Sequence, residues 1–163
     1  MICHLLHKNL VNLRHDTYKN LLHNIYYQPS MGDLETLDCS NVKPFSLKDM
    51  ILDAKVASVY DGDTITVVFK LFDSYYKWNC RLDGIDTPEI KTKNMDEKAR
   101  AIQARDYLRG IILNKVVSIT CGDFDKYGRL LVKVFYNNEN MNDKMIHLGY
   151  AKHYYGGTKE GWD

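Results

Sequence analysis

Three short stretches of this chain carry side chains that suit the binding of a cation and a phosphate. They are an Asp-Gly-Asp-Thr motif at residues 61–64, an Arg-Leu-Asp-Gly-Ile-Asp-Thr-Pro-Glu stretch at 81–89 and an Asp-Lys-Tyr-Gly-Arg turn at 125–129. Carboxylates supply the hard oxygen ligands that divalent cations prefer, a spare carboxylate can handle a water molecule, and two guanidinium groups can hold a phosphate. These are the groups that metal-assisted hydrolysis of a phosphodiester requires.

The acidic side chains of the first two stretches are the candidate cation ligands. Asp61 and Asp63 lie two residues apart at a bend, so their carboxylates can point to the same side. Pro88 fixes the backbone and holds Thr87 in an extended conformation, which could turn the Thr87 carbonyl and the Asp86 carboxylate inward. Taken alone, the first motif is more simply an ordinary turn, and the second is an ordinary strand end.

Two arginines are the candidate phosphate ligands. Arg81 ends a strand whose other residues have a buried pattern, and Arg129 closes the turn at 125–129. A guanidinium can form a bidentate hydrogen bond with a phosphate that lysine cannot match in geometry. Each arginine also has a plain structural explanation, as a surface charge or an ion-pair partner, and neither is decisive alone.

Strands must position these side chains. Apolar and polar residues alternate on both sides of Asp61-Gly62, a pattern typical of a β-hairpin. The predicted strands cover residues 54–60, 64–71, 75–82, 116–120 and 130–136.

One long helix is predicted over residues 96–112, with Asn94 and Glu97 as a capping pair at its start. Its apolar face comprises Ala101, Ala104, Leu108 and Ile111. A short helix over 142–148 ends at Gly149, and Gly156-Gly157 is predicted to release a polar tail. This order of elements indicates a mainly β fold with helices (α+β), a small closed or partly open β-barrel with helices packed outside it.

The three stretches, in this order and at these intervals, resemble the signature of the staphylococcal nuclease (thermonuclease) family. The segment 149–152 is similar to the closing element of that family, and the resemblance covers residues 54–155. It implies an OB-fold, a five-stranded β-barrel with two to three helices. The implied activity is calcium-dependent endonucleolytic cleavage of DNA and RNA with little sequence specificity, leaving 3′-phosphate and 5′-hydroxyl ends.

The resemblance also implies a role for individual residues. Asp63 and Asp86 look like the carboxylate ligands of one calcium ion, and Thr87 resembles the residue that binds it through its backbone carbonyl. Asp61 is similar to an acid that lies behind these ligands. The remaining implied roles are water activation or orientation by Glu89, phosphate binding by Arg81 and Arg129, and substrate contact by Lys126, Tyr127 and Tyr155.

The chain also departs from the pattern of this family. A second tyrosine of the family is replaced by Gly157, so the base pocket is expected to be looser. Covering the end of the barrel is an equally good explanation for Tyr154 and Tyr155. The net charge is only +1, which argues against binding of nucleic acid through overall charge alone, so a local site must hold a polyanion.

The chain of 163 residues has the length of one domain with an extension. Residues 1–50 are predicted to form a partly helical or loosely ordered amino-terminal extension, and residues 51–163 the nuclease-like OB-fold domain. A short amphipathic helix is predicted near the amino terminus, and 28–33 is predicted as a turn or linker. A zinc site is an open alternative for this extension, with candidate ligands at His4, His7, His15, His23, Cys3 and Cys39, although their spacing matches no standard pattern.

The remaining expectations concern compartment and partners. The apolar run Leu5-Leu6 is interrupted by His7 and Lys8, and no stretch reaches the ~20 apolar residues of a membrane span. The four cysteines are widely spaced, which favours reduced thiols. We therefore expect an intracellular, cytoplasmic protein with a DNA or RNA substrate, no membrane span and no obligate protein partner.

Two further functions stay open on the sequence alone. Barrels of this type also serve as nucleic-acid or protein adaptors, so a catalytically weak binding module is the alternative to an enzyme. A nuclease that its amino-terminal helix recruits to a lipid or a protein partner is a third reading. The complete set of acids and arginines favours the enzyme.

Overall fold

The computed structural model describes residues 30–159, 161 and 162. The chain divides into two compact units, Met1–Pro44 and Phe45–Asp163. The helix predicted near the amino terminus and five of the six candidate zinc ligands lie outside the described residues. Cys39, the sixth candidate, is exposed and has a free thiol.

The described part of the first unit contains a short helix, α3 (Met31–Glu35), and a 3-10 turn, η1 (Cys39–Asn41). Ser30 and Asp33 form a capping box, in which each side chain accepts a hydrogen bond from the backbone N–H of the other residue. The prediction of a turn or linker over 28–33 is therefore wrong from Met31 onward. The cause is this local pair, which satisfies the free N–H groups at the start of the helix.

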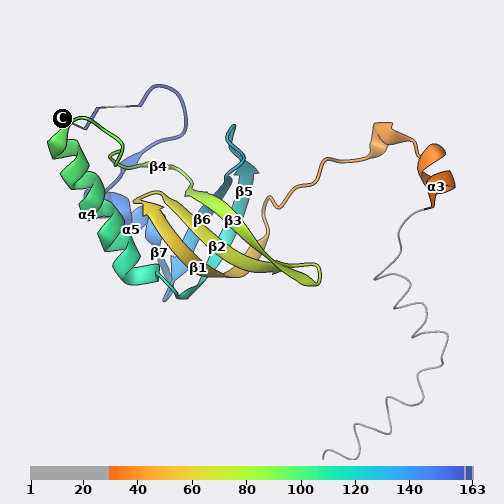
Figure 1. Ribbon diagram of the computed structural model, residues 1–163, viewed down its shortest axis with the longest axis horizontal. Coiled ribbons are helices and arrows are strands. Elements are labelled where there is room, and N and C mark those ends of the chain that lie inside the picture. The colour runs from red at the N-terminus through yellow and green to blue at the C-terminus, as the bar shows by residue number, and fades with distance from the viewer. Residues whose placement is uncertain (1–29, 160, 163) are drawn as a thin grey trace, which may run out of the picture. The chain divides into compact units, whose positions relative to one another are not determined.

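Five strands of the second unit form a closed barrel, as predicted (Figure 1). Strands β1 (Ile51–Asp61), β2 (Thr64–Leu71) and β3 (Ser74–Leu82) pair in antiparallel order, and β5 (Val116–Phe124) pairs with β1 and with β6 (Leu130–Tyr136). A parallel pairing between β3 and β6 closes the barrel. The structure confirms the predicted five-stranded OB-fold barrel of an α+β protein.

Alternation along the strands explains why these residues form a barrel. On β2, Ile65, Val67 and Phe69 point inward and are buried, whereas the residues between them are partly exposed. Phe69 stacks on Trp78 of β3, with ring centroids 5.1 Å apart. The apolar side chains from the inner faces of all five strands make one continuous core, which fixes the register of each strand.

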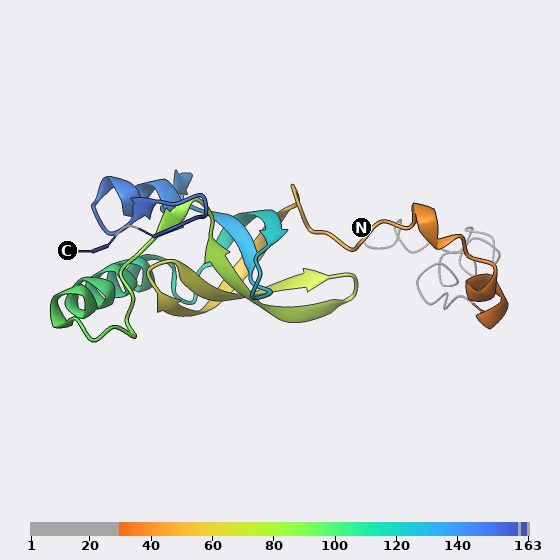
Figure 2. The ribbon, with the colours of Figure 1, turned by 90° about the horizontal axis from the view of Figure 1, so that it is seen from above.

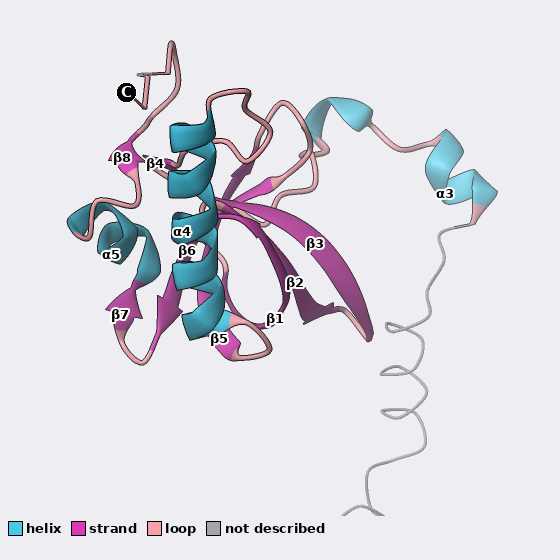
Figure 3. Cartoon of the chain, turned by 60° about the vertical axis from the view of Figure 1, so that its left-hand side comes forward, coloured by secondary structure: helices cyan, strands magenta, loops and turns pink. Residues whose placement is uncertain are grey.

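Two helices cover the barrel. Helix α4 (Met95–Ile112) lies along its outside beside β1, and α5 (Met141–His147) lies next to β6 (Figures 1 and 3). Three two-residue strands complete the unit: β7 (Glu139–Asn140) extends the sheet beyond β6, and β4 (Ile85–Asp86) pairs with β8 (Lys152–His153). None of the described helices is long and apolar enough to cross a bilayer.

Helix α4 begins one residue before its predicted start, with the predicted Asn94 as its cap, but the capping pair differs. The Asn94 side chain accepts hydrogen bonds from the backbone N–H groups of Asp96 and Glu97. The Glu97 carboxylate does not return to Asn94; it accepts hydrogen bonds from the Thr92 hydroxyl and the Glu89 backbone N–H. The acid at this position therefore holds the loop before α4 rather than completing a capping box.

A buried asparagine ties α5 to the barrel. The Asn142 amide donates to the carbonyls of Asp83 and Val132, at 2.9 and 3.0 Å, and its carbonyl accepts from the Val134 N–H at 3.0 Å. The residue is only 2% exposed. Because Asp83 begins the turn between β3 and β4, this side chain fixes the loop that leads to Asp86.

The carboxy-terminal segment folds back instead of leaving the barrel. After Gly156-Gly157, the carbonyl of Gly161 accepts a hydrogen bond from Lys152 at 2.8 Å, and the carbonyl of Trp162 accepts one from Arg100 at 2.9 Å. The Lys152 ammonium lies 4.8 Å from the centre of the Trp162 ring. The prediction of a released tail is wrong for these residues, because hydrogen bonds from β8 and α4 hold their carbonyls.

Candidate functional site

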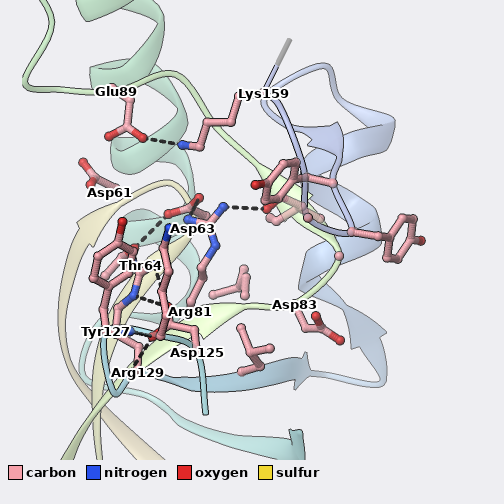
Figure 4. A pocket seen from close by; sticks show the side chains of 18 residues that line it. Asp61, Asp63, Thr64, Arg81, Asp83, Glu89, Asp125, Tyr127, Arg129 and Lys159 are labelled. Carbon is pink, nitrogen blue, oxygen red and sulfur yellow. Dashed lines mark hydrogen bonds and ion pairs between the residues drawn. The ribbon is translucent and has the colours of Figure 1, made fainter. Parts of the chain in front are cut away.

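The three candidate stretches meet at a cavity of about 760 Å³ at one end of the barrel. The turns β1–β2, β3–β4 and β5–β6 surround it, together with the segment after β8. Figure 4 shows Asp63, Arg81, Glu89 and Arg129 at this cavity, with Tyr127 beside them. Within the three stretches, the structure thus brings together side chains that lie as much as 68 residues apart, since Asp61 and Arg129 both line the cavity.

Arg81 lies at the centre of the site. Its guanidinium contacts Asp63 Oδ2 at 2.5 Å and Asp86 Oδ1 at 3.1 Å, and it donates to the Ile85 carbonyl at 3.0 Å. The pairing of Thr64 with Arg81 in the β2–β3 ladder places the arginine beside the β1–β2 turn. All three charged side chains are nearly buried, with 12% of the Arg81 side chain exposed and 6% of each aspartate side chain.

Thr64 connects Asp63 to the second arginine. Its hydroxyl donates to Asp63 Oδ1 at 2.8 Å and accepts from the Arg129 Nη1 at 3.3 Å. Arg129 is oriented by Asp125 Oδ2, which accepts from both Nε and Nη2 at 2.7 Å. The two arginines, which come from β3 and from the β5–β6 turn, therefore belong to one polar network.

The same network continues to Glu89 through a lysine that the sequence analysis did not select. Lys159 Nζ lies 2.8 Å from Asp86 Oδ1 and 2.6 Å from Glu89 Oε1, as the dashed line to Glu89 in Figure 4 shows. The backbone of Glu89 is held by Glu97 of α4. Burial lowers the pKa of Lys159, but hydrogen bonds to Asp86 and Glu89 outweigh it, so the pKa is raised overall.

Burial and repulsion from neighbouring carboxylates raise the pKa of Asp61 and Asp63. Burial is the largest cause of the shift of the Asp61 pKa to about 6, and the charges of Asp63 and Glu89 add to it. Burial also raises the pKa of Asp63, although Arg81 acts in the opposite direction. Asp61 Oδ1 is buried and has no hydrogen-bond partner among the described residues. Such crowded oxygen donors fit a hard divalent cation, which would relieve their repulsion.

The candidate ligands nevertheless form no compact group of their own. Among residues 30–159, 161 and 162, no three His, Cys, Asp or Glu side chains are gathered as a metal-binding cluster. Asp86 and Thr87 are not among the residues that line the cavity, and they are 4% and 2% exposed. The predicted ligands, Asp63, Asp86 and the Thr87 carbonyl with Asp61 behind them, offer only oxygen donors, which is the donor type that hard divalent cations prefer.

Gly62 allows the two acidic stretches to approach each other. A Cβ atom at this position would lie 2.9 Å from Thr87 Cγ2 and 2.9 Å from Ala104 Cβ, closer than such atoms pack. The Asp61–Asp63 turn, Thr87 and α4 are thus in direct contact around a residue without a side chain. This explains in physical terms why glycine separates the two acids of the first motif.

Aromatic and basic side chains surround the opening of the cavity. The Tyr127 ring is 72% exposed and lies 5.1 Å from Lys126 Nζ and 5.5 Å from the Arg129 guanidinium carbon. Tyr155 is 85% exposed and its ring lies against the backbone of Gly84. Exposed rings beside cations are suited to stack on bases without sequence preference. All three predicted substrate residues therefore line the cavity.

Sequence reasoning missed three contributors to this site. Thr64 is the last residue of the first motif, but nothing in the motif shows that it connects the two arginines. Tyr154 lies with its ring centre 5.9 Å from the Arg81 guanidinium carbon, whereas the sequence explains it equally well as a residue that covers the end of the barrel. No sequence pattern marks Lys159 as a site residue, because it reaches the site only when the carboxy-terminal segment folds back onto the barrel.

Comparisons with known proteins identify relatives of the chain. A model of a protein family described as staphylococcal nuclease homologue matches residues 79–161. The thermonuclease of Staphylococcus hyicus is 34% identical over 101 residues, which cover 60% of this chain and 57% of the relative. An uncharacterized endonuclease of Escherichia coli O157:H7 is 33% identical over 101 residues, covering 61% and 60%. Endonuclease Htp3 of Saprolegnia parasitica is 28% identical over 142 residues, covering 74% and 67%.

The chain thus spans about three fifths of the length of the thermonuclease and of the bacterial endonuclease. The matched segment includes Arg81, Asp86, Glu89 and Arg129. Asp63 precedes the matched segment, and its contact with Arg81 places it in the same site. The match covers half of the chain and two named nucleases are more than 30% identical to it, so the chain belongs to the family of staphylococcal nuclease homologues.

Proposed function

We propose that the chain is a calcium-dependent endonuclease that hydrolyses phosphodiester bonds of DNA or RNA with little sequence specificity, leaving 3′-phosphate and 5′-hydroxyl ends. The observation that carries this proposal is the polar network from Arg129 through Thr64, Asp63 and Arg81 to Asp86 at a single cavity. Family membership and the relatives that are named nucleases support the reaction class.

Arg81 and Arg129 are the proposed phosphate-binding groups. Both are held in place before substrate arrives, Arg81 by Asp63 and Asp86 and Arg129 by Asp125. A guanidinium fixed in this way needs little reorganisation when negative charge grows on the phosphate, so it stabilises the transition state more than the substrate. Water attack on phosphorus breaks the bond to the 5′ oxygen, and the phosphate stays on the 3′ oxygen.

Glu89 is the proposed residue that orients or deprotonates the attacking water. Its side chain is 52% exposed at the edge of the cavity, while its backbone is held by Glu97. It can therefore reach a water molecule without losing its anchor. Calcium, when bound, would supply positive charge beside the scissile phosphate. Asp63 and Asp86 would hold it through carboxylate oxygens, with Thr87 contributing its carbonyl and Asp61 lying behind them.

A chelator-controlled digestion tests this function. Single-stranded DNA and RNA are incubated with the protein in calcium and in EDTA, and the product ends are identified by whether polynucleotide kinase labels the new 5′ ends without phosphatase treatment. We expect cleavage only with calcium, and direct labelling because the ends carry hydroxyls. Glu89→Gln should slow cleavage by about 10²-fold or more.

The matched control is Glu139→Gln, because Glu139 is also an exposed acid paired with a lysine but lies on β7. This variant should cleave at the wild-type rate. Intact substrate in calcium would contradict the proposal. Retained binding of the oligonucleotide under those conditions would identify the alternative, a nucleic-acid-binding module without catalysis.

A further inference from the structure

The carboxy-terminal segment places a positive charge among the acids of the site. Lys159 Nζ bridges Asp86 Oδ1 and Glu89 Oε1, and the Asp86 side chain that it contacts is only 6% exposed. Asp86 is a proposed calcium ligand and Glu89 the proposed water-orienting acid. One ammonium therefore contacts both the acid proposed to bind calcium and the acid proposed to orient water.

Contacts on both sides of Lys159 hold this segment in place. Before it, the Tyr154 hydroxyl donates to the Gly157 carbonyl at 3.0 Å. After it, Lys152 and Arg100 donate to the carbonyls of Gly161 and Trp162. The segment is therefore attached to β8 and α4, and Lys159 lies in the span between the attachments.

Among the described residues, two cations contact Asp86, and Lys159 is the one able to leave. The Arg81 side chain is 12% exposed and is also bound to the Ile85 carbonyl and Asp63, whereas the Lys159 side chain is 40% exposed. Gly156 and Gly157 precede Lys159, and a flexible side chain on such a segment can swing into solvent at small energetic cost.

We propose that Lys159 is a further residue of this site, an ammonium that orients Glu89 and Asp86 and competes with the divalent cation for them. This inference rests on the calcium site of the proposed function. A divalent cation at Asp86 and an ammonium on the same carboxylate repel each other, so cation binding displaces Lys159. The coupling is reciprocal. Contact of Lys159 with the two carboxylates lowers the affinity of the site for the cation, and removal of the lysine raises that affinity.

Calorimetric titration with calcium tests the competition. Wild-type protein is compared with Lys159→Met and with Lys126→Met, which removes one positive charge from the same cavity without touching Asp86 or Glu89. We expect Lys159→Met to bind calcium roughly fivefold more tightly, and Lys126→Met to change affinity by less than about twofold. Trp162→Ala removes the ring that contacts Lys152 and so weakens the attachment of the segment. Like Lys159→Met, it should increase the affinity for calcium.

Amine labelling of the wild-type protein provides a second readout. The acetylation rate of each lysine is measured by mass spectrometry with and without calcium, with Lys77 on β3 as the exposed control. Displacement predicts that calcium accelerates labelling of Lys159 several-fold and leaves Lys77 unchanged. Equal or slower labelling of Lys159 would overturn the competition.

The outcomes separate this inference from the function on which it rests. Calcium binding of equal strength in wild type and Lys159→Met would overturn the role of Lys159 and leave the calcium site intact. Absence of calcium binding in every protein would overturn the calcium site and this inference with it.

Discussion

At the residue scale, the two arginines of the site have different surroundings. Arg81 is nearly buried between Asp63 and Asp86, whereas Arg129 is twice as exposed and rests on Asp125 at the surface turn. A buried ion pair that loses one partner leaves an uncompensated charge, but an exposed pair does not. We therefore expect Arg81 to stabilise the fold in addition to its proposed role in phosphate binding, and Arg129 to contribute little to stability.

Replacing each arginine by methionine should separate these roles. We expect Arg81→Met to lower the free energy of unfolding by about 3–5 kcal/mol in EDTA, because Asp63 and Asp86 are then left facing each other. Arg129→Met should lower it by no more than about 1 kcal/mol. Both should slow cleavage by about 10²–10³-fold. Urea unfolding with parallel rate measurements tests this, and equal stability of the two variants would contradict the buried-pair account.

A pH dependence is expected from Asp125. Partial burial raises the pKa of Asp125, but the hydrogen bonds from Arg129 and the Tyr127 N–H outweigh it and hold the pKa below the ordinary value of 3.8. The folded state therefore binds this proton less readily than the unfolded state, so the stabilisation is present above pH 3.8 and is lost as the pH falls below it. Asp125→Asn should lower the free energy of unfolding by about 1 kcal/mol at pH 7.

The measurement is urea unfolding of both proteins across the acid range. The difference in stability between wild type and Asp125→Asn should shrink as the pH falls below about 4. A difference that stays constant down to pH 2 would show that the Asp125 charge does not stabilise the turn.

The acids and arginines were predictable because their chemistry is visible in their residue types. Asp61, Asp63 and Asp86 need partners or a cation wherever they converge, and a motif shows that they are close in sequence. The contacts of an acid are not predictable in this way: the sequence predicts that Glu97 completes the helix cap, whereas in the structure it holds the loop of Glu89. A carboxylate can satisfy several nearby donors, and only the folded backbone decides which of them it meets.

At the element scale, α5 holds the loop that carries Asp86 through a single buried side chain. Asn142 makes three hydrogen bonds to the β3–β4 turn and β6. Its truncation leaves buried backbone groups without partners, which is more costly than the loss of an exposed hydrogen bond. Asn142→Ala should therefore lower the free energy of unfolding by about 3 kcal/mol. Asn79→Ala, at an exposed asparagine bonded to Thr66, should change it by less than about 0.5 kcal/mol.

Chemical denaturation of these two variants measures how much the hydrogen bonds of Asn142 stabilise the protein. Similar stabilities for Asn142→Ala and Asn79→Ala would show that α5 is held by apolar packing alone.

Replacement by alanine should change the stability of the protein in opposite directions at two glycines, Gly62 and Gly110. Gly62→Ala forces the β1–β2 turn away from Thr87 and α4, so we expect a loss of about 2 kcal/mol and weaker calcium binding. Gly110 lies in α4, and nothing lies within 4 Å of a Cβ at that position. Gly110→Ala should raise stability by about 0.5–1 kcal/mol, since glycine is a poor helix former. Thermal unfolding of both variants tests the contrast, and a stabilising Gly62→Ala would refute the close contact.

Long elements with a clear period were predictable, and short ones were not. Alternation predicted β2 and β6 to the residue, and the 3.6-residue period predicted α4 within one residue. Strands β4, β7 and β8 are two residues long, so each exists through its partner strand rather than its own pattern. The helical start at Met31 likewise depends on one side-chain pair, Ser30 and Asp33.

At the scale of the whole molecule, the core of the barrel begins upstream of its first strand. Leu47 is 1% exposed within the core, and backbone hydrogen bonds join Asp49 and Met50 to Cys121 of β5. We expect a protein starting at Phe45 to fold and to keep its activity, because the second compact unit begins there. In that shortened protein, Leu47→Ala should lower the free energy of unfolding by about 2–5 kcal/mol.

Circular dichroism and thermal unfolding of the two shortened proteins measure this effect. Failure of the protein starting at Phe45 to fold would assign a structural role to the residues before it. Unchanged stability of Leu47→Ala would place the start of the core at β1.

The central claim is that Asp63, Asp86 and the two arginines act on one phosphate beside one cation. A crystal structure of the protein with calcium and an oligonucleotide that carries nonhydrolysable phosphorothioate linkages tests it most directly. We predict one calcium ion on the oxygens of Asp63 and Asp86, and one phosphate held by both Arg81 and Arg129. A calcium ion bound elsewhere, or a phosphate that only one of these arginines can reach, would contradict the account.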